Sequence, residues 1–197
     1  MTSLTNEQIR EYNDKGYLSP IDVLTSNQAN EVRKEIEKIE NKWPSELEGL
    51  GRNYIHLISP VFDSIVHNTK ILDAVESIIG KNILACGTTL FIKNPSEKGF
   101  VSYHQDARYI GLEPYNWVTV WVAITNSNEK NGCMKMLPGS HKENLKNHNQ
   151  KFDENNLLTR GQTIENVPEE KTEPVVLNAG QMSLHHPTIV HGSGINR

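Results

Sequence analysis

Apolar residues in the first 80 positions follow the period of amphipathic helices. After Thr25 they recur three or four residues apart, with glutamate and lysine between them: Ala29, Val32, Ile36, Ile39 and Trp43. A threonine followed three residues later by a glutamine, at Thr5 and again at Thr25, is a capping box and predicts that two helices begin there. A third helix is expected from Asn68 to Gly80, because a glycine can adopt the left-handed backbone that ends a helix.

From residue 83 the pattern changes to short β-branched and aromatic runs, which are typical of strands. Six such runs are predicted to be strands or strand pairs: 83–95, 101–110, 116–126, 132–138, 173–186 and 188–196. Asn131-Gly132 favours a hairpin turn, and Asn178-Ala179-Gly180 favours another turn. Residues 139–173 are polar and rich in asparagine, and a connection of this length is usually a functional lid.

Helices followed by many short strands favour an α+β fold over a parallel α/β sheet, which needs helices between its strands. The strands then form a β-sandwich or jelly roll. A chain of 197 residues is the size of one domain. We therefore expect a single domain over 1–197, mainly helical in 1–80, whose jelly-roll core in 81–197 carries the polar stretch as an insert.

Composition narrows the class of partner. The net charge is −4 and no basic stripe is present, which argues against binding to nucleic acid. The longest apolar runs are strand-sized, and the N-terminus lacks the basic and apolar segments of a secretory signal. These features predict a cytoplasmic monomer or homodimer with a small-molecule substrate and no membrane partner. Cys86 and Cys133 are expected to be free thiols.

The run YHQDARYIG places His104 and Asp106 two residues apart, so on a strand both side chains point to the same side. This spacing arises by chance in about one chain in four of this composition and is weak evidence by itself. A metal site with two histidines and one carboxylate needs a further histidine from another strand. The candidates are His185, His186 and His191, and the spacing alone leaves the choice open.

Other polar residues have ordinary explanations when each is taken alone. A lysine at a strand end, such as Lys93, is usually solvated, and a tryptophan such as Trp121 usually belongs to the core. Ser193 lies between two glycines and fits a turn. The remaining histidines are expected to be ordinary hydrogen-bonded residues: His56, His67, His141 and His148.

Several segments together resemble the phytanoyl-CoA dioxygenase family of iron(II)- and 2-oxoglutarate-dependent oxygenases. They are DKGYLSPIDVLTSNQANEVRKEIEKIE, YHQD, WVTVWVAITNSNEKNGCMKMLPGSHK and LNAGQMSLHHPTIVHGSGINR. Their combination in this order is far more specific than any one of them. The resemblance implies a double-stranded β-helix core, a cupin-like jelly roll, with the N-terminal helices packed on its sheet.

The resemblance also implies roles for individual residues. His104, Asp106 and His191 would hold iron(II), which 2-oxoglutarate chelates before O₂ reacts. Decarboxylation of 2-oxoglutarate to succinate and CO₂ would drive hydroxylation of a substrate. Because the carboxylate of Asp106 is present, hydroxylation is favoured over halogenation, for which relatives carry a small residue at this position. Residues expected to bind the cosubstrate are Lys93, Thr119, Trp121 and Ser193.

Within the family, LLTRGQ and the C-terminal run look most like a bacterial group that includes hydroxylases of small aminoalkylphosphonates. The resemblance therefore implies a small polar or anionic substrate, organophosphonates included. Arg108, Tyr109 and Arg160 are expected to contact its anionic group, because a guanidinium matches phosphonate oxygens in a bidentate way.

The chain departs from the family pattern after the last motif. The family continues with a further strand and an arginine that pairs with the far carboxylate of 2-oxoglutarate, whereas this chain stops at Arg197, six positions after His191. We expect the last core strand to be missing and Arg197 to replace that arginine imperfectly. Two alternatives to an active oxygenase follow: a truncated or degenerate member that binds metal or ligand without turnover, and a cupin-like metalloenzyme that does not use 2-oxoglutarate.

Overall fold

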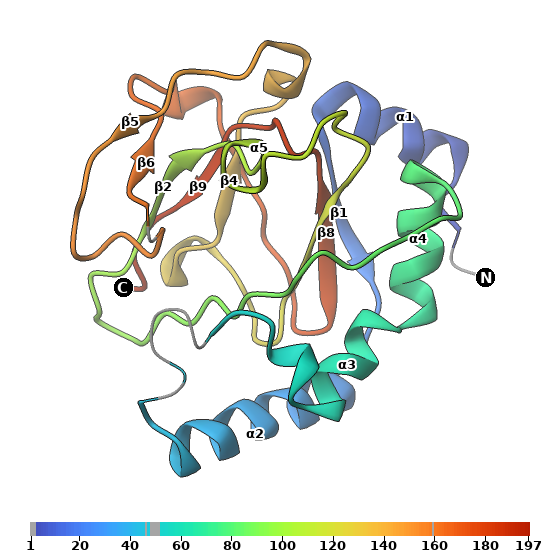
Figure 1. Cartoon of the computed structure of the whole chain (residues 1–197), viewed down its shortest axis with the longest axis vertical. Coiled ribbons are helices and arrows are strands. Elements are labelled where there is room, and N and C mark those ends of the chain that lie inside the picture. Colours follow the sequence, from blue (N-terminus) through green and yellow to red (C-terminus); the bar gives the residue numbers. More distant parts are fainter. Residues whose placement is uncertain (1–2, 46, 48–51, 159) are drawn as a thin grey trace.

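Two antiparallel sheets form the centre of the computed structural model, which describes residues 3–45, 47, 52–158 and 160–197 (Figure 1). The three-stranded sheet has the order β1 (Tyr17–Asp22), β8 (Gln181–His185) and β3 (Thr119–Val122). The four-stranded sheet has the order β2 (Val101–His104), β9 (His191–Ser193), β4 (Met134–Met136) and β7 (Glu173–Pro174). A short ladder joins β5 (Asn149–Gln150) to β6 (Gln162–Thr163).

Helices form most of the N-terminal part, as the apolar period predicted. The α-helices are α1 (Asn6–Lys15), α2 (Ser26–Lys42), α3 (Pro60–Val66), α4 (Thr69–Ile79) and the short α5 (Ala107–Ile110). Single 3-10 turns occur at η2 (Ile55–Leu57), η3 (Glu129–Asn131), η4 (Ser140–Lys142) and η5 (Glu169–Lys171). Both predicted capping boxes are confirmed, since the hydroxyls of Thr5 and Thr25 each accept a backbone N–H at 3.2 Å. Gly80 ends α4 with φ +86° but an extended ψ, so its backbone is not left-handed helical.

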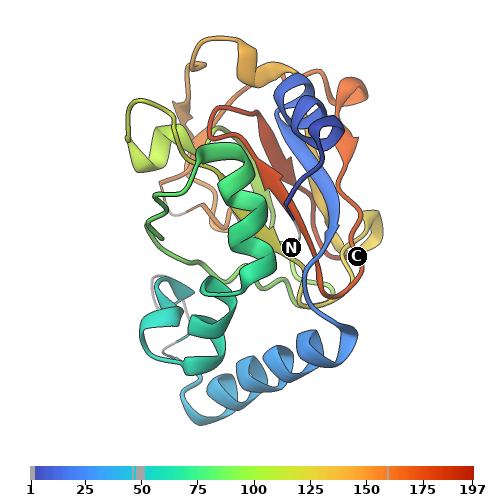
Figure 2. The ribbon, with the colours of Figure 1, turned by 90° about the vertical axis from the view of Figure 1, so that its right-hand side faces the viewer.

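Strand β8 separates two apolar clusters because successive side chains point to opposite faces. Met182 and Leu184 are fully buried against α1 and α4, which cover the outer face of the three-stranded sheet (Figure 2). Ser183 and His185 point the other way, toward the four-stranded sheet. Between the sheets lies a second cluster: Tyr17, Trp121, Ala123, Met134, Met136, Val175, Leu177 and Ile189. A third cluster lies between α2 and α3 and includes Val32, Ile39 and Phe62.

Two strand predictions were wrong: the one for 83–95, and the second half of the one for 101–110, where Ala107–Ile110 form the helix α5. The segment 83–95 forms no ladder in the described residues, and Thr89 makes only an isolated bridge with Asn53. Its apolar side chains find no neighbouring strand, and Leu84 is 84% exposed. Conversely, β1 forms within the part expected to be mainly helical, because its backbone pairs with β8. Whether a segment forms a strand depends on the available partner strand as much as on its residue types.

The predicted hairpin at Asn131-Gly132 is also wrong. Asn131 ends η3, and its side-chain oxygen accepts the backbone N–H of Asn128 at 2.8 Å in a capping box. Gly132 follows with φ +75°, and the chain passes from β3 in one sheet to β4 in the other. The turn at 178–180 is confirmed: the backbone N–H of Gln181 donates to the Asn178 carbonyl at 3.0 Å.

The polar insert 139–173 is docked on the four-stranded sheet, with residue 159 outside the described residues. The backbone N–H of Leu157 donates to the Phe100 carbonyl at 2.8 Å, and that of Ile164 donates to the Tyr103 carbonyl at 2.7 Å. These bonds continue the sheet beside β2. Movement of the insert as a lid stays a prediction.

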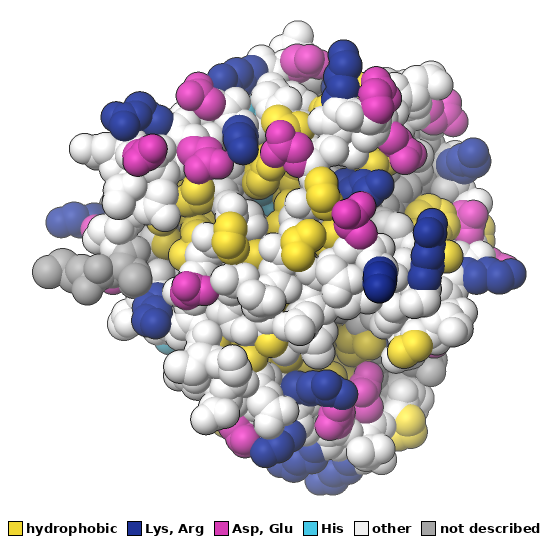
Figure 3. Space-filling view, turned by 180° about the vertical axis from the view of Figure 1, so that it is seen from behind, with side chains coloured by type: hydrophobic (Ala, Val, Ile, Leu, Met, Phe, Trp, Pro, Cys, Tyr) yellow, Lys and Arg dark blue, Asp and Glu magenta, His cyan; other side chains and the backbone are white. Residues whose placement is uncertain are grey.

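Surface composition agrees with the low net charge. On the face in Figure 3, acidic and basic side chains are interspersed, and hydrophobic side chains reach the surface between them. No helix among the described residues is long and apolar enough to cross a membrane.

Because the Leu184 side chain is fully buried, shortening it should greatly reduce the stability of the fold. Leu184→Ala is expected to lower the free energy of unfolding by about 2–5 kcal/mol, because a cavity forms between the sheet and its helices. Denaturant titration measures this change. Leu112→Ala, at a position 45% exposed, is the matched control and should cost under about 0.5 kcal/mol. Equal losses in both variants would contradict the core position of Leu184.

Candidate metal centre

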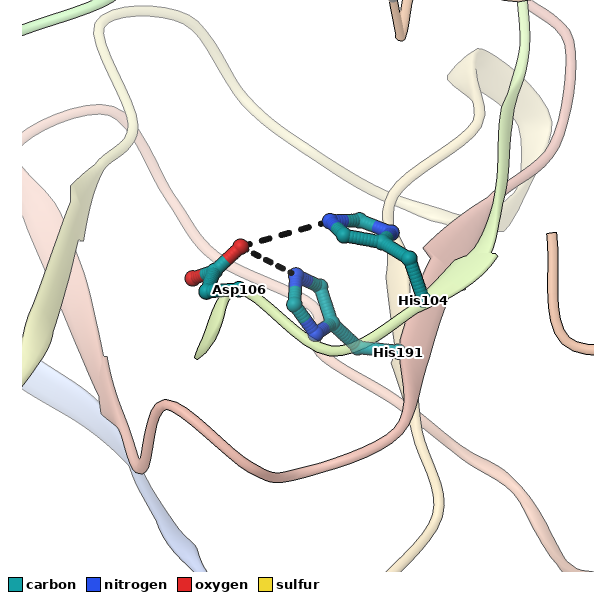
Figure 4. Close-up of side chains that lie close together, drawn as sticks. All are labelled: His104, Asp106 and His191. Atoms are coloured by element: carbon teal, nitrogen blue, oxygen red, sulfur yellow. Dashed lines mark ion pairs between the residues drawn. The ribbon is translucent and has the colours of Figure 1, made fainter. Parts of the chain in front are cut away.

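His104, Asp106 and His191 converge between the sheets (Figure 4). His104 ends β2 and His191 begins β9, and the two residues are paired across the antiparallel ladder. Oδ1 of Asp106 lies 3.3 Å from Nε2 of His104 and 3.6 Å from Nε2 of His191. Ligand atoms bonded at about 2.1 Å to one ion and at right angles lie about 3 Å apart. The three atoms are therefore spaced as metal ligands require.

Both imidazoles present an unprotonated nitrogen to this point. Nδ1 of His104 donates to the Ser102 carbonyl at 2.9 Å, and Nδ1 of His191 donates to the Ile189 carbonyl at 3.1 Å. A carbonyl oxygen only accepts, so each Nδ1 carries a proton, and in the neutral ring each Nε2 keeps its lone pair. Without a cation, two nitrogen lone pairs and a carboxylate oxygen would repel one another. The residues thus fit a bound metal ion.

The side chains of His104 and Asp106 were expected to lie together because both would point to one side of a strand, but the structure brings them together in another way. Strand β2 ends at His104, and Asp106 has helical backbone angles at the start of α5. Strand alternation therefore does not place the two side chains together. The turn is held by the backbone N–H of Ala107, which donates to the Pro187 carbonyl at 2.9 Å.

The second oxygen of Asp106 is held by the three-stranded sheet. Oδ2 accepts from the Thr119 hydroxyl at 2.6 Å and from Nε2 of His185 at 3.1 Å. Burial by itself would raise the pKa of Asp106, but the histidines around it, His191 foremost, hold the pKa well below its usual value. Burial lowers the pKa of His191 to about 3, with a further contribution from His104. A carboxylate and a neutral imidazole, the forms that bind metal, are therefore favoured at neutral pH.

Gln105, the middle residue of the motif, is fully buried and joins three segments. Its backbone N–H donates to Nε2 of His148 at 3.0 Å, and its Oε1 accepts the backbone N–H of Lys146 at 2.8 Å. Its Nε2 donates to the carbonyl of Thr188, three residues before His191, at 2.6 Å. Gln105 therefore ties the first two candidate ligands to the insert and to the segment that carries the third.

The three histidines left open by the spacing have different places. His191 joins the triad, and His185 reaches the outer oxygen of Asp106. His186 turns away: its Nδ1 lies 2.8 Å from the Thr188 hydroxyl, and its ring is 5.2 Å from that of His141.

The residues expected to bind 2-oxoglutarate lie in two places. Thr119 contacts Asp106, and Trp121 packs on the cluster between the sheets. Ser193 accepts from Nζ of Lys93 at 2.7 Å, and the ammonium also donates to the carbonyls of Gly132 and Gly194. Burial lowers the pKa of Lys93 to about 8.

Arg197 is exposed, and no contact joins it to the triad within the described residues. Its backbone N–H donates to the Lys130 carbonyl at 2.9 Å, and it lines a surface hollow with Glu129 and Lys135. Its pairing with 2-oxoglutarate stays a prediction.

Of the three expected substrate contacts, Tyr109 lies beside the metal centre and Arg160 lies next to Tyr109. The ring of Tyr109 meets the His104 ring edge-on, with centroids 5.6 Å apart. The guanidinium of Arg160 lies 6.0 Å above the Tyr109 ring. Arg108 is exposed on α5. All three roles stay predictions.

The sequence did not predict the hydrogen bonds that Gln105, His148 and His185 make around the metal centre. His148 was expected to be an ordinary histidine in a surface stretch, but it is buried. One signal was present: Ser183 and His185 alternate with Met182 and Leu184, so one face of this strand is polar although the strand is central.

The model of the phytanoyl-CoA dioxygenase (PhyH) family matches residues 12–197. The chain belongs to the phytanoyl-CoA dioxygenase family. It is thereby a member of a family of iron(II)- and 2-oxoglutarate-dependent dioxygenases, which confirms the enzyme class and cofactors that the motifs predicted.

Individual PhyH relatives are similar over nearly the whole chain. The probable alpha-ketoglutarate-dependent hypophosphite dioxygenase of Stutzerimonas stutzeri is 28% identical over 96% of this chain and 73% of that protein. The peroxisomal phytanoyl-CoA dioxygenase of Homo sapiens is 28% identical over 98% of this chain, which spans 64% of the human protein. Apo ThoJ, a non-heme monooxygenase, is 32% identical with a TM-score of 0.83, over 96% of this chain and 72% of that chain. The TM-score confirms the predicted fold class.

The position of Gln105 predicts an effect on metal affinity. Gln105→Met keeps the side-chain length but removes both side-chain hydrogen bonds, so the ligand-bearing segments lose their link. We expect the affinity for iron(II) or cobalt(II) to fall about 10- to 100-fold in a competition titration. Gln150→Met, at an exposed position of the insert, is the matched control. A lower melting temperature with unchanged metal affinity would show that Gln105 only stabilises the fold.

His186 predicts a pH dependence of stability. Burial, together with His141 and His185, lowers the pKa of His186 from 6.5 to about 4. Between these pH values the unfolded chain takes up a proton here that the folded chain does not. The free energy of unfolding therefore falls as the pH is lowered through this window. His186→Asn keeps an acceptor for the Thr188 backbone N–H but does not titrate. Urea unfolding of the metal-free variant should depend less on pH, and an equal dependence would contradict this role.

Proposed function

We propose that this chain is an iron(II)- and 2-oxoglutarate-dependent dioxygenase that hydroxylates a small polar or anionic molecule, with His104, Asp106 and His191 as the iron ligands. The observation that supports it most is the convergence of two imidazole lone pairs and one carboxylate oxygen. When bound, iron supplies the reaction between O₂ and 2-oxoglutarate, whose decarboxylation to succinate provides the oxidising power.

The protein's own groups orient this chemistry. The two histidines are buried, whereas 19% of the Asp106 side chain is exposed, so the centre is reached from the side of Asp106. Thr119 and His185 hold Oδ2, which leaves Oδ1 for the metal. A carboxylate held in this way would occupy a coordination position of the bound iron, and its presence supports hydroxylation over halogenation.

Two features support a small polar or anionic substrate. Tyr109 places a phenol ring against His104, and the Arg160 guanidinium lies 6.0 Å from that phenol ring. The relative from Stutzerimonas stutzeri is named for hypophosphite, a small anion. Lys93, Ser193 and Trp121 are the proposed cosubstrate contacts, in one oxygenase domain over 1–197. The cytoplasmic location and the monomeric or dimeric state stay predictions.

A second function is favoured by a specific observation. The Lys93 ammonium already has three protein oxygens as acceptors, and Arg197 is exposed away from the triad. Neither Lys93 nor Arg197 is then placed to balance the far carboxylate of 2-oxoglutarate, whose burial without a cation is costly. This favours a family member that binds metal without turnover of 2-oxoglutarate.

One assay separates these functions. Anaerobic protein with iron(II) and 2-oxoglutarate should show a weak visible metal-to-ligand charge-transfer band, and admitting O₂ should release succinate. His191→Ala removes a proposed ligand and should abolish both signals, whereas His67→Ala, at an exposed position, should keep them. Metal binding with neither band nor succinate would support the second function or a cupin-like enzyme of another class. Retained activity in His191→Ala would exclude the proposed ligand set.

A further inference from the structure

The inner face of β8 carries two polar side chains, Ser183 and His185. Ser183 lies opposite Trp121, and His185 lies opposite Thr119, in the antiparallel ladder with β3. Directly opposed residues share one face of a sheet. Because Thr119 donates to Asp106, this is the face that borders the metal centre.

Each of the two side chains has a buried polar atom without a hydrogen-bond partner among the described residues. These atoms are Oγ of Ser183 and Nδ1 of His185, whose residues are 0% and 1% exposed. Buried polar atoms are nearly always paired, so each unpaired one calls for an explanation. Two of them on one strand face, beside the metal centre, indicate that a bound molecule supplies the missing partners.

The hydrogen bonding of His185 defines what that molecule offers. Nε2 of His185 donates to the carboxylate of Asp106, so in the neutral ring Nδ1 keeps a lone pair and only accepts. Its partner must be a donor. The Ser183 hydroxyl both donates and accepts, so it accommodates the same group. An anionic oxygen has no proton to give, so it does not pair with Nδ1 of this neutral ring.

We propose that Ser183 and His185 form a substrate subsite that receives a hydrogen-bond donor, a hydroxyl or a protonated amine, of the molecule oxidised at the metal. The proposal rests on the function proposed above and adds a second recognition point to it. Tyr109 lies against His104, and the Arg160 guanidinium, 6.0 Å from the Tyr109 ring, suits an anionic group. The substrate class is thus a small molecule with an anion at one end and a hydroxyl or amine at the other.

The subsite lies next to a part of the interior that solvent reaches. Thr119 and Trp121 on β3 are only half-buried, and Asp106 is partly exposed, whereas the neighbouring β8 residues are closed off. The ring of His185 also lies 4.7 Å from that of His191, measured between centroids. A group bound at His185 is therefore held beside a proposed iron ligand.

Binding is tested directly with three probes that share an anion and differ in the donor: 2-aminoethylphosphonate, 2-hydroxyethylphosphonate and ethylphosphonate. Protein labelled with nitrogen-15 histidine is titrated with each, with and without zinc(II). The Nδ1 resonance of His185, assigned by its loss in His185→Gln, should shift with the first two probes and not with ethylphosphonate. A shift with none of the probes, or an equal shift with all three, would overturn the subsite.

Variants then measure the contribution of each side chain. Ser183→Ala should weaken binding of 2-aminoethylphosphonate about tenfold, with little change for ethylphosphonate. His185→Gln removes the ring acceptor but keeps an N–H for Asp106, and the same loss is expected with cobalt(II) affinity retained. Ser59→Ala, which removes a hydroxyl from another buried serine, is the matched control and should bind all probes normally. If both variants bind the amine probe as tightly as the unmodified protein, the two atoms pair with buried water and the subsite is refuted.

Failure of this proposal and failure of the oxygenase reaction are distinguishable. Donor-dependent binding without the charge-transfer band or succinate would remove the reaction and leave the subsite. Succinate release without donor-dependent binding would remove the subsite and leave the reaction.

Discussion

The carboxylate of Asp106 joins the two sheets, and the arrangement of the site depends on it. One oxygen faces His104 and His191 on the four-stranded sheet, and the other accepts from Thr119 and His185 on the three-stranded sheet. A charge this far inside a protein is costly unless it is surrounded by partners. The partners come from strands that pair only in the finished fold, so the position of the carboxylate depends on correct packing of both sheets.

Polar contacts, more than apolar packing, fix the ligand-bearing segments relative to one another. Gln105 hydrogen-bonds to the insert through His148 and Lys146, and to the segment before His191 through Thr188. Because these bonds are buried, breaking one leaves an unpaired group and is disfavoured. The first part of the insert therefore helps to hold the ligand-bearing segments in place around the metal centre.

The centre also links metal binding to folding. Proton positions set by the carbonyls of Ser102 and Ile189 direct two nitrogen lone pairs at the same carboxylate oxygen. With neutral rings this arrangement is unfavourable without a cation and favourable with one, so a bound metal would stabilise the native state over the unfolded chain. The unpaired atoms of Ser183 and His185 follow the same principle, since a polar ligand would complete what the fold leaves unsatisfied.

Local signals in the sequence determined the helices α1, α2 and α4, and long-range pairing decided the strands. Capping boxes at Thr5 and Thr25 act within one helical turn, so they specified α1 and α2 without the fold. The order of the motifs determined the family and the fold class. Three outcomes depended on which strands become neighbours: 83–95 lacks a partner, Asn131-Gly132 separates strands of different sheets, and β1 pairs with β8. The choice of His191 over His186 depends likewise on the pairing of β9 with β2, because hydrogen bonds between segments far apart in the chain leave no mark on local sequence.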